Sequence, residues 1–421
     1  MNRLAKEYRV FRSCRHDMRT LLTANMIFAL VMPVIDVFVA AYVMRNSHAV
    51  KLVVAYQLAV YTGIPAAFLL NGVLLRRAGA ERLYAAGMLL IGLSMAAMMS
   101  SGSLGFSGVV LWGLSMGAAY GLFAANRALL ALTSTEDGNR NYYYGLEMFF
   151  YTATSVLVPL AVGWLIGCAP AYGWFGGESN RAYRAVAAAV CGLSVMAVLV
   201  LRRGRFEKHR LGRFLHLRFH PLWYRMLWLG GLKGLAQGYI ATAPAMLILL
   251  LVGQEGALGL VQACGGLLSA FVLYGVGRMA APEHRLRVFA AGLTLFFLGG
   301  VVNALLFNAA GVLILVGCLL LAKPLLDAAY FPIQFRVTEI IAGMEGRDAY
   351  AYIFNHECAE YAGRVVGCGV FLLLAIEASD VAALKYALPA IGAVHLISLA
   401  VAGPLLRRVA GPAASVAASA D

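Results

Sequence analysis

Charged residues are scarce in this chain of 421 residues. Asp, Glu, Lys and Arg make up 13% of it, hydrophobic residues make up 62%, and the mean hydropathy is +0.78. Soluble domains carry about twice that share of charge. The composition therefore excludes a soluble enzyme or a nucleic-acid-binding domain and indicates a protein whose solvent is the lipid bilayer.

Motifs of other functions are also missing. No G-x-x-x-x-G-K-[S/T] phosphate loop is present, which argues against ATP as an energy source. No two cysteines have a C-x-x-C spacing, and no His, Cys or carboxylate group has the spacing of metal ligands. We therefore expect no enzyme activity, no cofactor and no metal.

Long apolar windows are what the sequence does have. About 30 Å of hydrocarbon takes roughly 20 helical residues to cross, and unpaired backbone groups in lipid cost several kcal/mol. The windows, twelve in number, fall at 19–44, 50–75, 83–101, 105–133, 142–167, 182–201, 224–252, 258–277, 286–307, 309–338, 349–376 and 386–406. They predict an all-α integral membrane fold of twelve transmembrane helices.

Basic residues gather at alternate ends of these windows. With the amino terminus in the cytoplasm, 26 of the 34 Lys and Arg residues fall in inner segments and five in outer loops. Such a bias favours the cytoplasmic side, so the net charge of +14 indicates membrane anchoring rather than nucleic-acid binding. We predict a multi-pass protein of a bacterial cytoplasmic (inner) membrane with both termini in the cytoplasm.

A long polar connection near the midpoint divides the windows into two sets of six. Tyr and Glu residues of the fifth window recur 210 residues later in the eleventh, which indicates a duplication: Tyr142, Glu147 and Tyr151 become Tyr352, Glu357 and Tyr361. The predicted divisions are a basic leader at 1–18, a six-helix bundle at 19–201, a basic linker at 202–223, a second six-helix bundle at 224–409 and a tail at 410–421.

The turn after the second window carries a family resemblance. Its sequence, Gly72-Val-Leu-Leu-Arg76-Arg77-Ala-Gly79, is similar to the signature loop of the major facilitator superfamily, which joins spans two and three. Gly72, Arg77 and Gly79 match, whereas Arg76 stands where the family usually has aspartate. The resemblance implies two six-helix bundles that rock about a midplane cavity, usually as a monomer, and a loop that holds the bundles together in the outward-facing state.

Small residues and prolines recur within the windows. Glycines four residues apart predict close helix contacts, either as simple packing or as sliding faces: Gly113, Gly117, Gly121, Gly230, Gly234, Gly238, Gly363 and Gly367. The fifth window, with Pro159, Gly163 and Gly167, resembles a degenerate antiporter-associated pattern. Prolines are candidate kinks at positions 33, 65, 244, 324 and 332.

Eight ionisable residues fall inside the windows, where a charge costs ~2.5–3.5 kcal/mol even on the mild insertion scale and so needs a partner or water. They are Asp36, Glu147, Lys233, Lys323, Asp327, Glu357, Glu360 and Arg364. Acids outnumber bases, so we expect at least one carboxylate to be protonated or to face a wet cavity.

Spans one, four, seven and ten line the cavity in the resembled fold, which gives a candidate substrate set. Its members are Lys233, Gln237, Lys323, Asp327, Asn25, Asp36 and Asn126. Two lysines suit a small organic anion or a zwitterion. The alternative is a structural Lys323–Asp327 pair that closes on itself.

Glu357, Glu360 and Arg364 share one helical face, which makes them candidates for proton coupling. The alternative is that Arg364 only neutralises the two acids for insertion. Glu147 joins the candidates, with a structural pairing to Arg127 or Arg140 as its alternative.

Together these features predict a secondary active transporter that moves a small organic solute by alternating access and is driven by protons. The alternatives are an uncoupled facilitator or lipid flippase, and an integral-membrane enzyme, which should gather its acids and bases near one interface.

Overall fold

The computed structural model describes residues 11–47, 49–101, 104–135, 137–206, 212, 214–253, 255–279 and 285–409. Most of the predicted leader, part of the predicted linker and the predicted tail lie outside these residues.

The first half of the described chain is a series of long helices. Its first span consists of α2 (His16–Phe28), α3 (Met32–Val34), the π-helical turn η1 (Ile35–Val39) and α4 (Ala40–Ser47). The next spans are α5 (Val50–Leu74), α6 (Ala80–Ser100), α7 (Phe106–Ser134), α8 (Asp137–Cys168) and α9 (Ser179–Leu201), with the 3₁₀ turn η2 (Trp174–Gly177) between the last two.

The second half repeats this plan. Its first span consists of α10 (Pro221–Ile240) and α11 (Ala243–Leu251). Then follow α12 (Glu255–Met279), α13 (Arg285–Leu306), α14 (Ala309–Glu345), α15 (Ala349–Glu377) and a last span made of α16 (Asp380–His395) and α17 (Ser398–Val409).

Eleven helical segments of the described residues are long and apolar enough to cross a membrane. The eighth predicted window corresponds to α12, whose described apolar stretch, Gly256–Val272, is shorter. Large apolar side chains such as Trp228, Phe271 and Leu305 are more than 70% exposed on the outside of the bundle, as lipid contact requires. The chain is a multi-pass helical membrane protein, which confirms the predicted fold class.

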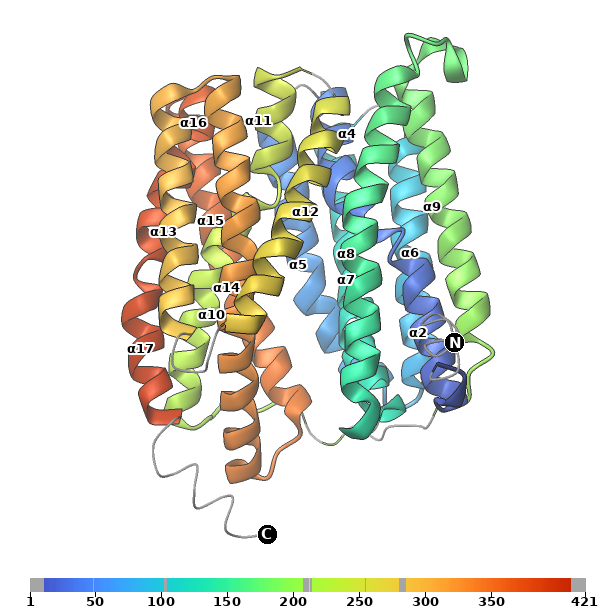
Figure 1. Cartoon of the computed structure of the whole chain (residues 1–421), viewed down its shortest axis with the longest axis vertical. Helices are drawn as coiled ribbons and strands as arrows, with labels where there is room; N and C mark the ends of the chain where they lie inside the picture. The colour runs from blue at the N-terminus through green and yellow to red at the C-terminus, as the bar shows by residue number, and fades with distance from the viewer. Residues whose placement is uncertain are drawn as a thin grey trace.

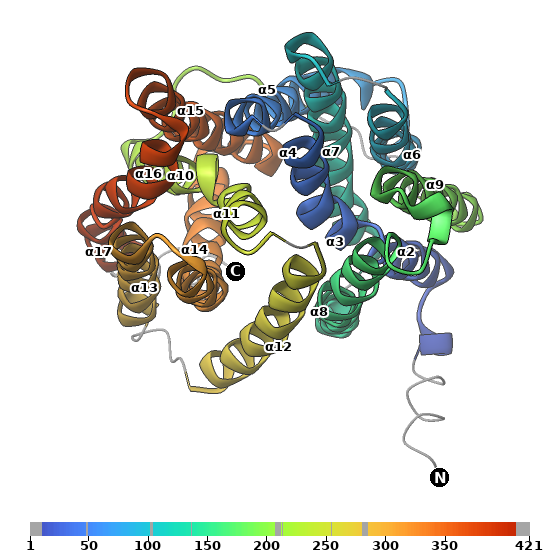
Figure 2. The ribbon, with the colours of Figure 1, turned by 90° about the horizontal axis from the view of Figure 1, so that it is seen from above.

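The two ends of the bundle differ. One end, here called the linker end, holds the start of α2, the end of α9, the start of α10 and the end of α17, at the bottom of Figure 1. The opposite, far end holds α4, α11 and the turn between α8 and α9 (Figure 1). From above, the helices of the first half lie on one side and α10 to α17 on the other, with α12 between α14 and α8 (Figure 2).

Two of the five candidate prolines coincide with breaks. The first span is interrupted by a turn at residues 29–31, just before Pro33, and the seventh at 241–242, just before Pro244. A proline lacks the N–H of the helical ladder and fits best at a helix start, which explains both positions. Pro65, Pro324 and Pro332 lie inside continuous helices.

Glycine faces join the closest helix pairs of each half. A Cβ on Gly117 of α7 would overlap the backbone of Val60 on α5, and a Cβ on Gly234 of α10 would overlap that of Glu360 on α15. Only glycine permits this backbone approach. The structure therefore confirms the predicted close helix contacts.

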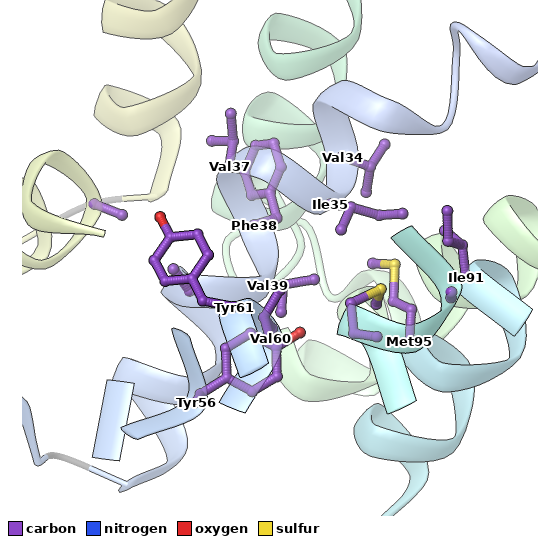
Figure 3. Close-up of a cluster of buried hydrophobic side chains, with 14 of the residues drawn as sticks. Val34, Ile35, Val37, Phe38, Val39, Tyr56, Val60, Tyr61, Ile91 and Met95 are labelled. Carbon is purple, nitrogen blue, oxygen red and sulfur yellow. The ribbon is translucent and has the colours of Figure 1, made fainter. Parts of the chain in front are cut away.

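A buried apolar cluster packs against the interrupted first span. Figure 3 shows Val37, Phe38 and Val39 of η1 near Tyr56 and Tyr61 of α5. Further side chains of the same cluster are Ile91 and Met95 of α6, which are fully buried. This packing fixes the π turn, which carries Asp36, against two long helices.

Candidate functional site

A cavity of ≈ 480 Å³ lies between the two halves, lined by residues of η1, α5 and α7 from one and α10, α12 and α14 from the other. Its charged lining residues are Asp36, Lys233, Lys323 and Asp327. Its other polar residues are Tyr56, Gln57, Tyr61, Tyr120, Gln237, Gln262, Tyr330 and His395. The volume falls within the range of small-molecule sites.

Asp36 faces this cavity from the π turn η1. A π turn inserts an extra residue into a helix and often marks a functional position. The residue is exposed although its sequence neighbours Ile35 and Val37 are buried, and Tyr120 of α7 donates a hydrogen bond of 3.0 Å to its Oδ1. The carboxylate of Asp36 is thus positioned by the Tyr120 hydroxyl and still faces the cavity.

Lys323 and Asp327 stand one helical turn apart on α14 and both line the cavity. No hydrogen bond or ion pair within 4.0 Å links Lys323 to any residue that the structure describes. It acts electrostatically on Asp327 and on Asp36 across the cavity. The predicted alternative of a closed Lys323–Asp327 pair is therefore not what the structure has: the ammonium group stands open between two carboxylates.

Lys233 also lines the cavity, but its ammonium group is engaged. Its Nζ lies 2.8 Å from Oε1 of Glu360 on α15 and 4.3 Å from the centre of the Tyr330 ring. The sequence predicted two lysines available to a substrate. The structure leaves Lys323 open and gives Lys233 to Glu360, because α10 and α15 approach closely through their glycine faces.

Glu360 is the centre of a larger network, here called the C-half network, formed by Lys233, Glu357, Glu360 and Arg364. Arg364 Nη2 lies 2.6 Å from Oε2 of Glu360, and Arg364 also binds Glu357. The Nε of Arg364 donates to the side chain of Gln237 at 3.0 Å. The three candidate coupling residues are thus in direct contact, and Lys233 and Gln237 connect them to the cavity.

Aromatic and imidazole groups enclose this network. Tyr330 Oη lies 2.6 Å from Nε2 of His356, whose Nδ1 is 3.8 Å from Glu360. Arg364 stacks over the ring of Tyr61, with 4.9 Å from its Cζ to the ring centre. Tyr61 belongs to the first half and donates from its hydroxyl to the backbone oxygen of Gln237 at 2.7 Å. The network therefore touches the interface between the halves.

Glu147 belongs to a separate group, here called the N-half network, formed by Asn25, Arg127, Tyr143 and Glu147. Arg127 binds both carboxylate oxygens of Glu147, at 3.1 and 2.8 Å, and Asn25 donates to Oε1 at 2.7 Å. None of these four residues lines the cavity. The structural pairing with Arg127 is the alternative that the structure supports; the side chain of Arg140 lies outside the described residues.

Two members of the candidate substrate set are placed elsewhere. Asn25 is bound in the N-half network and accepts a hydrogen bond of 2.8 Å from Tyr84. Asn126 is fully buried and donates to Asn71 at 2.6 Å, between α7 and α5. Both were chosen because their helices were expected to line the cavity, but each points into a neighbouring helix of its own half.

The signature-like loop lies at the linker end. A Cβ on Gly72 would overlap the ring of Phe214, which is buried against Tyr350 at 5.5 Å between ring centres. Arg76 and Arg77 are exposed and make no ion pair with any described residue. Gly79 precedes α6, where a Cβ would meet the carboxylate of Glu81.

The cavity also has an aromatic and amide lining that was not predicted from the sequence, above all Tyr61, Tyr120 and Gln57. A polar side chain inside an apolar window was the available signal, but it does not say which helical face turns inward. Residues 113–117, Gly-Leu-Ser-Met-Gly, also have the spacing of a hydrolase nucleophile turn. They lie in the middle of α7, where Ser115 bonds Ser94 at 2.7 Å, not at the strand-to-helix turn that this chemistry needs.

This arrangement of helices around a central cavity is a fold shared with solved transporters. A bacterial homologue of the human lysosomal transporter Spinster, in an inward-facing and unoccupied conformation, superposes with a TM-score of 0.65 and 12% sequence identity, covering 95% of this chain and 97% of that one.

Other similar structures are peptide transporters. A mutant of the peptide transporter POT gives a TM-score of 0.65 at 12% identity over 93% of this chain and 95% of that chain. A structure described as showing substrate recognition in proton dependent oligopeptide transporters gives 0.63 at 14% identity over 93% and 99%. At these identities the likeness establishes the fold alone.

In sequence, the chain is similar to the uncharacterized protein YqgE of Bacillus subtilis (strain 168). The two are 23% identical over 390 residues, which cover 89% of this chain and 86% of YqgE. No family model matches the chain.

Proposed function

We propose that this protein is a secondary active transporter that moves a small organic solute across the membrane by alternating access and is driven by protons. The observation that carries the proposal is the cavity between the halves, which is lined by the open Lys323, by two carboxylates and by Lys233 of the C-half network. Ionised groups inside a membrane protein are costly unless they serve a substrate or ion path. The moving units of the proposal are the two bundles, 19–201 and 224–409.

The cavity chemistry favours a solute with both signs of charge. Lys323 offers an ammonium group that makes no hydrogen bond or ion pair within 4.0 Å with any described residue, and Asp36 and Asp327 offer carboxylates to a cationic group. Tyr56, Tyr61 and Tyr120 supply hydroxyl groups and apolar faces around them. A small zwitterion fits this set, and an organic anion that binds Lys323 alone fits it less fully.

The C-half network is the proposed site of proton coupling. Glu357 and Glu360 share Arg364, so protonation of one carboxylate changes how strongly the arginine holds the other. Lys233 lines the cavity and binds Glu360. A charged substrate near Lys233 would therefore change the protonation equilibrium of the two glutamates.

Transport by purified protein in proteoliposomes tests this proposal. A thermal-shift panel of amino acids, short peptides, organic acids and sugars first identifies a ligand, because binding raises the unfolding temperature. Uptake of that ligand is then driven by an imposed pH gradient. The double substitution Glu357→Gln and Glu360→Gln should abolish uphill uptake while downhill exchange of labelled substrate continues. Uphill uptake by the double variant would retire the proton role, and flux that ignores the gradient in the unmodified protein would support an uncoupled facilitator.

The proposed location is a bacterial cytoplasmic membrane, with the linker end and both termini in the cytoplasm. The basic bias of the linker-end segments supports this orientation. In a cysteine-free background, a single cysteine at Arg76 should react with a membrane-impermeant maleimide only after lysis. A single cysteine at Asn180 should react in intact cells. The reverse labelling pattern would show that the protein has the opposite orientation in the membrane.

A further inference from the structure

A second concave site lies on the outer face of the bundle at the linker end, away from the central cavity. This groove has a volume of ≈ 330 Å³ and runs between the start of α2 and the end of α9. Its lining residues are Phe11, His16, Arg19, Thr20, Thr23, Val200 and Arg203. Both helices lie at the edge of the molecule in Figure 2.

The groove is basic, and its arginines have no side-chain partner among the described residues. The Nε of Arg19 is buried yet makes no hydrogen bond, and Arg203 makes no side-chain hydrogen bond or ion pair with any described residue. No acidic residue lines the groove among the residues that the structure describes. The neighbouring carboxylate, Asp17, is occupied by Arg15 at 2.9 Å and by its own helix start.

The threonine hydroxyls in the groove are not free donors. Thr20 and Thr23 donate to backbone oxygens one turn earlier, each at 2.8 Å. The available donors are therefore the guanidinium groups of Arg19 and Arg203 together with the imidazole of His16. Guanidinium groups match the tetrahedral oxygens of a phosphate, and an unpaired buried N–H indicates a missing acceptor.

An apolar track leads from this basic end along α9. Leu199, Met196 and Val195 share one face of the last turns of α9, shortly before the turn that carries Arg203, and they are 55%, 44% and 46% exposed. The track points toward the middle of the bilayer, since α9 crosses it as a membrane span. A phosphate at the arginines would thus continue into an acyl chain on Leu199 and Val195.

We propose that this groove binds the headgroup of an anionic phospholipid, with its phosphate held by Arg19 and Arg203 and one acyl chain along the exposed face of α9. Basic pockets between membrane helices at the interfacial level recognise such headgroups. The site would tie the first and last spans of the N-terminal half to one lipid molecule.

The test uses the full chain, purified in detergent and delipidated, then titrated with phosphatidylglycerol or phosphatidylcholine while bound lipid is counted by native mass spectrometry. The variant Arg19→Gln/Arg203→Gln should bind phosphatidylglycerol about thirtyfold more weakly, since each basic side chain near an anionic surface contributes about a factor of five. Phosphatidylcholine binding should be weak in every form of the protein.

The matched control is Arg12→Gln/Arg202→Gln. It removes the same charge at the same end from exposed residues that do not line the groove, and it should retain phosphatidylglycerol as the unmodified protein does. Equal losses in both double variants, or none in the groove variant, would overturn the proposal. Should the groove variant fold poorly, the exposed single change Arg203→Gln should still weaken binding about fivefold.

Inorganic phosphate distinguishes the lipid from a soluble phosphate. Millimolar phosphate should leave the count of bound phosphatidylglycerol unchanged, because it lacks the acyl chain. Displacement of the lipid by phosphate alone would overturn the assignment to a lipid.

Discussion

The two halves of this protein hold their buried charges in different ways. In the N-half network, Glu147 is bound by Arg127 and Asn25, and the group is closed off from the cavity. In the C-half network, Glu360 binds both Arg364 and Lys233, and Lys233 lines the cavity. The N-half network does not reach the cavity and the C-half network does, although Glu147 and Glu357 are related by the same offset of 210 residues.

The difference starts from one arginine. Arg127 reaches Glu147 from α7, whereas Arg336, which stands 209 residues later, is half-exposed and lies 3.8 Å from Glu339 on its own helix. Glu357 therefore lacks the partner that Glu147 has and binds Arg364 on α15 instead. The repeated acidic position thus forms a separate ion pair in one half and part of a network connected to the cavity in the other, because its arginine partner lies on a different helix in each half.

The largest expected effect separates the two networks by function. Glu360→Gln should abolish pH-driven uptake, because it removes the carboxylate that joins Lys233 to Arg364. Glu147→Gln should keep uphill uptake per folded molecule. Both variants are compared in proteoliposomes at equal protein content. Loss of coupling in Glu147→Gln alone would reverse the comparison.

Stability should distinguish the networks in the second test. Arg364→Gln leaves two carboxylates without their shared cation, and removing one partner of a buried pair costs about 3–5 kcal/mol. Arg127→Gln should cost less, because the Arg127 side chain is 40% exposed and that of Arg364 is 9% exposed. Unfolding in mixed detergent micelles measures both. An equal loss would mean that water screens both networks alike.

Glycine packing should contribute similarly to stability in both halves, so that the halves differ only in their charge networks. Gly117→Ala and Gly234→Ala both push a methyl group into a neighbouring backbone and should each destabilise the protein by about 1–3 kcal/mol. Gly369→Ala, where a Cβ meets nothing within 4 Å, is the control. Thermal unfolding in detergent gives the order, and a tolerant Gly234→Ala would show that α10 can move away from α15.

The smallest effect on stability should come from the open lysine. Lys323→Ala should leave the unfolding temperature nearly unchanged, since no described residue loses a hydrogen bond or an ion pair within 4.0 Å. It should weaken substrate binding about ten- to a hundredfold, the loss of one charged hydrogen bond. Lys233→Ala should lower the unfolding temperature, because it leaves Glu360 with one cation fewer. Unfolding temperatures and substrate-binding curves are measured for both variants. A large drop in the unfolding temperature of Lys323→Ala would show that the charge of Lys323 is structural.

Much of the fold was predictable because lipid leaves few choices. Hydropathy located the eleven membrane-length helices of the described chain and the shorter apolar stretch of α12, since a chain in hydrocarbon must bond its own backbone. The glycine spacing of α10 and α15 predicted that each makes a close helix contact, although it did not say with which helix. The five candidate prolines were less informative. Only Pro33 and Pro244 coincide with breaks, because a long helix tolerates proline where neighbouring helices support it.

The site was predictable in type and less so in detail. Buried charge indicated Asp36, Lys233, Lys323 and Asp327, and all four line the cavity. Asn25 and Asn126 were misplaced because an amide carries no charge to force it toward water, so it can bond a neighbouring helix instead. Which lysine would be engaged depended on a contact between α10 and α15 that spacing alone does not give.

The seam between α8 and α12 has a mechanical consequence. A Cβ on Gly259 would overlap the backbone of Pro159 and lie 3.0 Å from Gly163, so the two halves meet there almost without side chains. Such surfaces can rotate past one another without a change of side-chain rotamer. In the proposed alternating-access movement this line would act as the pivot, and Gly259→Ala should slow turnover more than it weakens substrate binding.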